Sequence, residues 1–312
     1  MSAEATAAIQ VRNLTKRFAS VAAVNSVSLD CAPGEVFGFV GPDGAGKTTI
    51  MRLLAAVMAP DEGSITIEGL DAVANPELVR SRVSYMPQRF GLYEDLTVDE
   101  NIAFFADLFS ISRRDRDERA ARLLAASGMT SFRKRRAGQL SGGMKQKLGL
   151  TCSLIHTPKV LLLDEPTAGV DPVSRRDFWR ILYGLRGEGV AIVVATSYLD
   201  EAERCARLGL LRDGRMVYCD APAALKALMP GQILAIASHE ARKVREVVDG
   251  RDGVKGAILM GDSVHAVVDD IDRRASEIIG ALAAAGIQVE EVERIEPSIE
   301  DLFVSLLTER KA

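Results

Sequence analysis

The order of apolar and polar residues predicts alternating strands and helices over the first two thirds of the chain. Three runs are almost continuously apolar, as strands buried in a parallel sheet are: residues 35–40, 160–163 and 190–196. Residues 9–11 and 26–31 alternate like strands of an antiparallel edge sheet, with residues 13–20 between them. Residues 49–58 predict a helix with an apolar face. The combination indicates an α/β fold.

Residues 97–128 carry a different pattern, with apolar side chains at helical spacing and few strand signals. We therefore predict a helical insert in this region. Two basic clusters, residues 113–122 and 133–136, fall within this region and just after it. A run of charges usually covers a solvated helix face, and we favour that interpretation over contact with a partner or with anionic headgroups.

The pattern changes again near residue 229. Six segments follow in the order β-α-β-β-α-β of ferredoxin-like domains: residues 233–237, 240–248, 254–260, 264–268, 274–285 and 287–295. Ser298 and Asp301 then form a capping box that begins a terminal helix. We predict two domains, residues 1–228 and 229–312. The second is a small α+β domain for regulation, dimer contact or docking.

The composition argues against several classes of protein. The 312 residues are 47% hydrophobic and 26% charged, and the formal net charge of −4 argues against a general nucleic-acid binder. The four cysteines are scattered without a C-x-x-C pair, so we expect reduced thiols in the cytosol. Residues 1–10 lack the features of a signal peptide, and no apolar run of about 18 residues predicts a membrane span.

The strongest chemical signal is a glycine-rich segment between the predicted strand 35–40 and the predicted helix 49–58. It fits G-x-x-x-x-G-K-[ST] and consists of Gly41, Pro42, Asp43, Gly44, Ala45, Gly46, Lys47, Thr48 and Thr49. Backbone N–H groups and the helix N-terminus favour phosphate at such a loop. Lys47 is expected to reach the outer phosphates of a nucleoside triphosphate, and Thr48 to hold Mg²⁺. We favour this interpretation over the alternative, an ordinary glycine-rich strand-to-helix turn, because the full motif lies between a predicted strand and a predicted helix.

Four further motifs follow in a fixed order. Gln88 comes just after the predicted strand 83–86, and residues 140–146 read LSGGMKQ. Residues 160–165 end in Asp164 and Glu165, and residues 168–172 read AGVDP. With the phosphate loop, these motifs resemble the Q-loop, signature, Walker B and D-loop elements of ATP-binding cassette (ABC) proteins, over roughly residues 8–227. The resemblance implies a P-loop NTPase fold with a mixed sheet, an antiparallel β subdomain and a helical subdomain at about residues 89–150.

The resemblance also implies roles for individual residues. Asp164, together with Thr48 and Gln88, matches the residues around Mg²⁺, and Glu165 matches the general base that activates water. Phe18 matches the aromatic residue that stacks on adenine, where the family usually has tyrosine. The residues that match those meeting ATP bound to a second cassette are Ser141, Gly142, Gly143 and Asp171. We therefore expect a dimer, most simply of two copies of this chain.

Ser197 departs from the family pattern. It stands at the position of the switch histidine, after the predicted strand 190–196. Serine is shorter than histidine and cannot become charged, and loss of one transition-state donor typically slows a reaction by about 10²–10³-fold. We expect Glu165 to sustain hydrolysis that is slow or dependent on a partner. A water molecule, or Ser197 itself, restoring the contact is the alternative.

Residues 297–304 (PSIEDLFV) resemble the closing motif of ATPase subunits that serve ABC-2-type exporters. This resemblance implies a separate membrane permease, contacted near Gln88, and a place on the cytoplasmic face of the membrane. The expected function is to energise efflux, including the drug and multidrug efflux branch. The alternatives are a regulatory or weakly hydrolysing cassette, motivated by Ser197, and a soluble ABC ATPase outside transport.

Overall fold

The computed structural model describes residues 7–89 and 91–308, so most of the segment tested for a signal peptide lies outside the described residues. The chain divides into two compact units, Met1–Cys219 and Asp220–Ala312. The division falls before the predicted boundary at residue 228, because helix α8 (Pro222–Lys226) packs against helix α11 (Ile299–Thr308) of the second unit. Within the described residues, no helix is long and apolar enough to cross a membrane.

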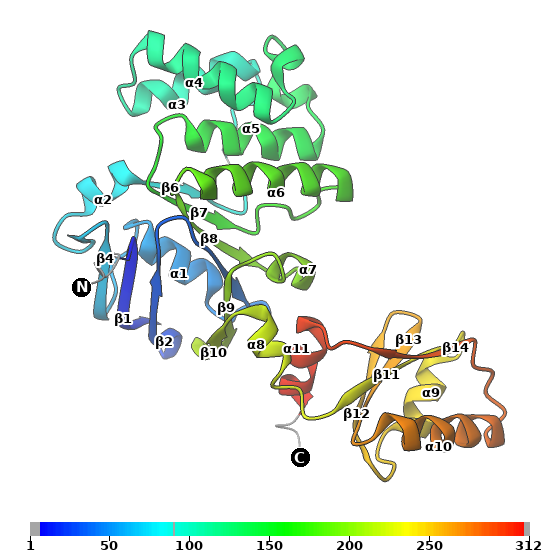
Figure 1. The fold of residues 1–312 in the computed structure, drawn as a ribbon. Coiled ribbons are helices and arrows are strands. Elements are labelled where there is room, and N and C mark those ends of the chain that lie inside the picture. Colours follow the sequence, from blue (N-terminus) through cyan, green and yellow to red (C-terminus); the bar gives the residue numbers. More distant parts are fainter. Residues whose placement is uncertain (1–6, 90, 309–312) are drawn as a thin grey trace. The chain divides into compact units, whose positions relative to one another are not determined.

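A six-stranded mixed sheet forms the centre of the first unit (Figure 1). Its order is β10-β9-β3-β8-β7-β6, with the bounds β3 (Val36–Val40), β6 (Val83–Met86), β7 (Val160–Asp164), β8 (Ala191–Thr196), β9 (Arg207–Arg212) and β10 (Arg215–Asp220). Strands β6, β7, β8, β3 and β9 are parallel neighbours. Every residue of β3, β7 and β8 is buried, which explains their continuous apolar sequences.

A four-stranded antiparallel sheet lies beside it, in the order β2-β1-β4-β5. Its bounds are β1 (Ile9–Phe18), β2 (Val21–Cys31), β4 (Glu62–Ile67) and β5 (Leu70–Asp71). The prediction that residues 13–20 separate two short strands is wrong, because nearly all of that segment is strand. Bulges hide it: the pairing register shifts along β1, and Asn13 and Ser26 have left-handed backbone angles, φ 49° and 55°.

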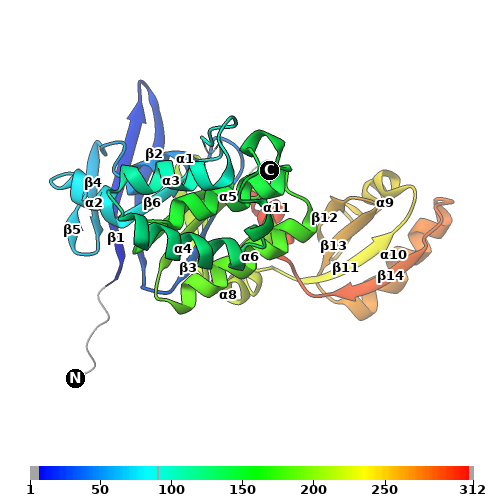
Figure 2. The same cartoon turned by 90° about the horizontal axis from the view of Figure 1, so that it is seen from above.

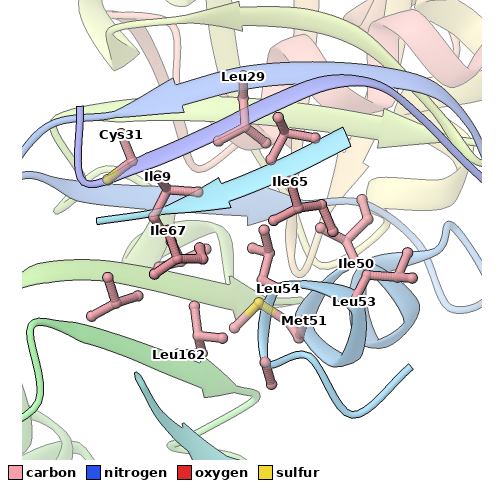
Figure 3. Packing of buried hydrophobic residues seen from close by; sticks show 14 of the residues in the cluster. Ile9, Leu29, Cys31, Ile50, Met51, Leu53, Leu54, Ile65, Ile67 and Leu162 are labelled. Carbon is pink, nitrogen blue, oxygen red and sulfur yellow. The ribbon is translucent and has the colours of Figure 1, made fainter. Parts of the chain in front are cut away.

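Helix α1 (Lys47–Leu54) lies between the two sheets (Figure 3). Ile50 and Leu54 are completely buried, and they share one core with Ile9 and Ile67 of the antiparallel sheet and Leu162 of β7. Each such side chain contributes about 1.5–3 kcal/mol by leaving water. The core therefore fixes the helix whose first residue is Lys47.

The helical insert predicted at residues 97–128 is confirmed as helical: it holds α3 (Val98–Leu108) and α4 (Arg113–Ala126). Helix α5 (Gly142–Leu154) follows it and packs against α6 (Pro172–Gly187), as Figures 1 and 2 show. Shorter elements connect these layers: α2 (Pro76–Arg82), the 3₁₀ turns Thr130–Phe132 and Ala137–Gln139, and α7 (Leu199–Ala202).

The basic clusters of the helical insert are largely tied to other parts of the first unit. Arg133 pairs with Asp99 at 2.8 Å, and Arg119 donates to the carbonyl of Ile155 at 3.0 Å. The guanidinium of Arg135 lies over the ring of Phe132. These contacts lie inside the first unit, and the interpretation of the clusters as a solvated helix face stays a prediction.

The second unit has the predicted β-α-β-β-α-β order. Its elements are β11 (Gln232–Ala237), α9 (Ala241–Val248), β12 (Val254–Met260), β13 (Ser263–Val268), α10 (Ile271–Ala284) and β14 (Glu291–Ile295). The antiparallel sheet order β12-β13-β11-β14 confirms the ferredoxin-like prediction, although the last strand is shorter than expected. Val244 of α9 and Ile278 of α10 pack on the sheet in one apolar core.

Helix α11 contacts β12 and is fixed to the sheet by a polar clasp. Asp301 is completely buried, and its Oδ1 lies 2.6 Å from Nδ1 of His265 on β13. Its other oxygen, Oδ2, accepts from the hydroxyl and the backbone N–H of Ser298, at 2.6 and 2.9 Å. The N–H of Asp301 donates back to the Ser298 hydroxyl at 3.1 Å, which confirms the predicted capping box.

Asp301→Ala should destabilise the second unit by about 2–4 kcal/mol, because it removes a cap and leaves the partly buried His265 and Ser298 without their acceptor. Urea unfolding of the full chain measures this, with exposed Glu300→Ala as the matched control from the same helical turn. Equal stability of the two variants would contradict the clasp.

The stability difference between wild type and Asp301→Ala is also expected to depend on pH. Burial raises the pKa of Asp301, but the bonds from His265 and Ser298 outweigh it, so the net pKa lies below the ordinary 3.8. The charged carboxylate therefore stabilises the native state above about pH 4, and this contribution is lost as the pH falls through the lower native pKa. The difference in unfolding free energy between wild type and Asp301→Ala, measured by urea unfolding, should therefore become smaller below pH 4.

Candidate functional site

The phosphate loop connects β3 to α1 and borders a pocket of about 320 Å³. Gly46, the N-cap residue just before α1, has φ 102°, and a Cβ atom there would lie 2.3 Å from the carbonyl oxygen of Ala23. Only glycine fits this position. The pocket brings together most of the predicted nucleotide-binding residues: Phe18, Asp43, Gly44, Ala45, Gly46, Lys47, Thr48, Thr49, Gln88 and Glu165.

Lys47 reaches across the mouth of the loop. Its Nζ donates to the carbonyl oxygens of Gly41 and Pro42, at 2.7 and 3.3 Å, and to the Ser197 hydroxyl at 3.1 Å. The carboxylate of Glu165 lies 3.6 Å away, and both charged side chains are nearly buried. The ammonium is thus held where an incoming phosphate can accept its hydrogen bonds.

Asp164 ends β7 beside Thr48. The Thr48 hydroxyl donates to its Oδ1 at 3.2 Å, and the Tyr85 hydroxyl donates to its Oδ2 at 3.3 Å. Burial raises the pKa of Asp164, with neighbouring Glu165 adding to the effect and the two hydroxyl donors opposing it. Burial, followed by the charge of Asp164, also raises the pKa of Tyr85 to about 12, so Tyr85 keeps its proton and remains a donor.

Glu165 and Ser197 form a second contact at the same sheet edge. The Ser197 hydroxyl donates to Oε1 of Glu165 at 2.7 Å, and the Ser197 backbone N–H donates to Oε2 at 3.1 Å. Glu165 has a left-handed backbone with φ 50°, held by its N–H bond to the carbonyl of Ala195 at 2.8 Å. Such a conformation costs on the order of 1–3 kcal/mol in a non-glycine residue. The surrounding bonds must therefore hold Glu165 in place.

The signature and D-loop residues lie together, and none of them lines the pocket. Ser141 caps α5 by accepting from the N–H of Met144 at 3.3 Å, and Asp171 caps α6. Bonds from Ser174, followed by the N–H of Val173, lower the pKa of Asp171. A Cβ added at Gly143 would lie 2.5 Å from the Ser174 hydroxyl, so α5 and α6 approach closely here.

Several site residues escaped prediction from the sequence. Tyr85 lies in the predicted strand 83–86, but only the folded sheet places its hydroxyl beside Asp164. Glu201 is completely buried, and it accepts from Thr167 and from Thr196, the latter at 3.0 Å. The residues around Glu201 in the sequence are polar and acidic, as on an exposed helix face, so the sequence does not indicate that Glu201 is buried.

Comparison with known proteins decides the family. The ABC transporter family pattern matches residues 24–168. The chain is 34% identical over 308 residues to the daunorubicin resistance ATP-binding protein DrrA2 of Streptomyces coeruleorubidus, covering 97% of this chain and 96% of that protein. The chain belongs to the ABC transporter ATP-binding proteins. This cassette is also 44% identical over 305 residues to the probable multidrug ABC transporter ATP-binding protein YbhF of Escherichia coli (strain K12).

That second alignment covers 96% of the cassette but 52% of YbhF, so the chain spans about half the length of that relative. Among solved structures, the dimeric post-hydrolysis state of the ATP-binding cassette MJ0796 bound to ADP and Pi matches with a TM-score of 0.63 and 26% identity. The match covers 68% of this chain and 98% of MJ0796. The predicted P-loop NTPase fold of the ABC type is thereby confirmed.

Gly143→Ala should lower the unfolding free energy by about 1–3 kcal/mol, because the new methyl group forces α5 away from α6. Gly142→Ala is the control, since the nearest atom to its added Cβ is 3.8 Å away. Ser174→Gly in the Gly143→Ala background should recover part of the loss. Thermal unfolding measures all three, and equal effects at positions 142 and 143 would contradict the packing argument.

Proposed function

We propose that this cassette binds and hydrolyses ATP and energises efflux through a separate ABC-2-type permease. The observation that carries the proposal is that four side chains meet at the phosphate loop. Lys47, Glu165 and Ser197 contact one another, and Asp164 accepts a hydrogen bond from Thr48. A cationic amine, a buried carboxylate for a cation and a second carboxylate for water are the groups that phosphoryl transfer to water requires.

The chemistry of the donor set fits Mg²⁺. Asp164 and Thr48 present adjacent oxygen atoms, the ligand type that Mg²⁺ prefers, and the buried Asp164 carboxylate accepts its hydrogen bonds from the neutral hydroxyls of Thr48 and Tyr85. Gln88 lines the same pocket and is a further oxygen donor. The ion would neutralise charge on the phosphates of ATP. Lys47 would bind the outer phosphates, and Phe18, which is 47% exposed at the pocket rim, would stack on adenine.

Glu165 is the proposed general base. Ser197 holds both of its carboxylate oxygens, and this orients the carboxylate without the switch histidine of the family. A serine in this position supplies no cation toward the γ-phosphate, so turnover is expected to be slow in the isolated cassette. The weakly hydrolysing cassette is therefore the second candidate function, and Ser197 is the observation that favours it. Nothing in the sequence or fold favours a soluble ABC ATPase outside transport.

The proposed active unit is a dimer of two cassettes, most simply two copies of this chain. Ser141, Gly142, Gly143 and Asp171 lie at the N-termini of α5 and α6, outside the pocket of their own chain. A helix N-terminus suits a γ-phosphate presented by a partner. MJ0796, the solved relative bound to ADP and Pi, is itself dimeric.

A groove of about 500 Å³ near the site supports the permease as partner. It is lined by Ala55, Val57, Glu77, Arg80, Ser81, Val83, Tyr85 and Phe109. Val57 is 57% exposed, and Phe109, which stacks on His156, is 37% exposed. Tyr85 borders the groove and also bonds Asp164, so an occupant of the groove would touch the site through one side chain. We propose that a cytoplasmic segment of the permease docks here, which places the cassette on the cytoplasmic face of the membrane.

Ser197→His should raise steady-state ATP turnover by about tenfold or more, because imidazole restores a transition-state donor while the backbone N–H at position 197 is kept. Phosphate release by purified wild type and variant measures this. Glu165→Gln in each background is the control and should remove turnover. A histidine variant no faster than wild type would show that serine is no handicap.

Val57→Asp should abolish co-purification of the cassette with its permease, because it places a charge in an apolar part of the groove. The matched control is Ile279→Asp, which changes another exposed apolar residue (44% exposed) on α10. The measurement is recovery of a polytopic permease, identified by mass spectrometry, from detergent-solubilised membranes. Loss with both variants, or with neither, would count against the groove as the docking site.

A further inference from the structure

Glu201 is a buried carboxylate that has no role in the proposed mechanism described above. It belongs to the short helix α7, whose other two acidic neighbours face solvent: the side chain of Asp200 is 59% exposed, and Glu203 is exposed. Glu201 itself is completely buried. Burying a carboxylate is unfavourable unless hydrogen bonds and charge compensate for lost water.

The compensating groups come from three separate segments. Oε2 accepts from the Thr196 hydroxyl at 3.0 Å, and Oε1 accepts from the Thr167 hydroxyl. Both threonines are completely buried. Arg175 on the first turn of α6 brings its Nε to 3.6 Å from Oε1, and its guanidinium also covers the ring of Tyr198 at 4.3 Å.

The two threonines flank the reacting groups. Thr167 lies two residues after Glu165, and Thr196 immediately precedes Ser197. Thr196 is itself fixed on both sides, because its hydroxyl also accepts from the N–H of Tyr198 at 3.0 Å. One carboxylate therefore ties the turn that follows β7 to the turn that follows β8.

Arg175 extends this link toward the predicted dimer seam. It lies one helical turn after Asp171, the cap of α6, and its N–H bonds the carbonyl of Asp171 at 2.9 Å. The Glu201 carboxylate thus meets, directly or through Arg175, the segments that carry Glu165, Asp171 and Ser197.

We propose that Glu201 is a positioning residue for ATP hydrolysis: it fixes Glu165 and Ser197 relative to each other through Thr167 and Thr196. This inference rests on the proposed function. A purely structural anchor would not need a charge, since buried Ala202 already anchors α7. Hydrogen bonds to two hydroxyls, unlike apolar packing, have a preferred direction and so define the geometry of both turns.

The test replaces the threonines, because removing Glu201 leaves the buried hydroxyls of Thr167 and Thr196 without their acceptor, keeps only Asp200 beside Arg175, and risks unfolding the chain. Thr167→Val and Thr196→Val keep the shape and lose the hydroxyl; Thr167→Ser and Thr196→Ser keep the hydroxyl. Glu203→Gln is the control, an exposed acidic residue at the end of the same helix. Steady-state ATPase kinetics and thermal unfolding are measured for the full chain, with its permease where turnover of the cassette alone is too slow to follow.

Each valine variant is expected to lower kcat about tenfold with KM for ATP changed less than about twofold, as for an interaction that acts in the transition state. The serine variants and Glu203→Gln should stay within about threefold of wild type. In a Ser197→Ala background, Thr196→Val should have little further effect, because the two residues act through one contact.

Three other results would contradict the inference or the function on which it rests. Valine variants that lower the melting temperature but keep wild-type kcat would reduce Glu201 to a structural anchor and overturn the inference. Serine variants as slow as the valine variants would also overturn it, because packing and not the hydroxyl would then be responsible. Absence of ATP turnover by wild type, with and without the permease, would instead overturn the proposed function from which the inference starts.

Discussion

The close packing of α1 between two sheets is the constraint on which the rest of the first unit depends. Ile50 and Leu54 are buried in the core shared by the two sheets, so the helix can neither rotate nor slide without exposing apolar surface. Gly46, at its start, lies against the carbonyl of Ala23 with no room for a Cβ atom. The phosphate loop therefore has a fixed shape before any ligand arrives, and binding does not have to order it.

The sheet topology then gathers the chemistry at one edge. Strands β3, β7 and β8 are parallel neighbours, so their carboxyl ends meet where the phosphate loop, Asp164 with Glu165, and Ser197 follow. Three distant parts of the sequence thus form one hydrogen-bonded group. The same edge carries Tyr85, at the end of β6, which contacts Asp164 from the side of the groove. Tyr85 therefore belongs both to the lining of the groove and to the hydrogen bonds of the site.

Sequence alone could predict the parts of this arrangement that local patterns encode. The apolar runs of β3, β7 and β8, the glycines of the loop, and the Ser298–Asp301 cap are local features, and the structure has each of them. Long-range contacts could not be predicted in the same way. The length of β1 is masked by bulges, and the burial of Glu201 depends on Thr167 and on Arg175 of α6, which are far from it in sequence. The roles of Ser141 and Asp171 depend on a partner, so they stay predictions.

Ser197, predicted to stand at the position of the switch histidine, makes contacts that the sequence motifs do not show. Serine is short enough for its hydroxyl to bond Oε1 of Glu165 and accept from Lys47 while its own N–H bonds Oε2. Ser197 thus holds the carboxylate of Glu165, the residue that we propose as the general base. Because Glu165 also has a strained backbone, its carboxylate needs such support to keep one orientation. In the proposed mechanism, the cassette therefore has a fixed base in place of one transition-state donor, and we expect a slow basal reaction whose rate depends on how a partner subunit completes the site.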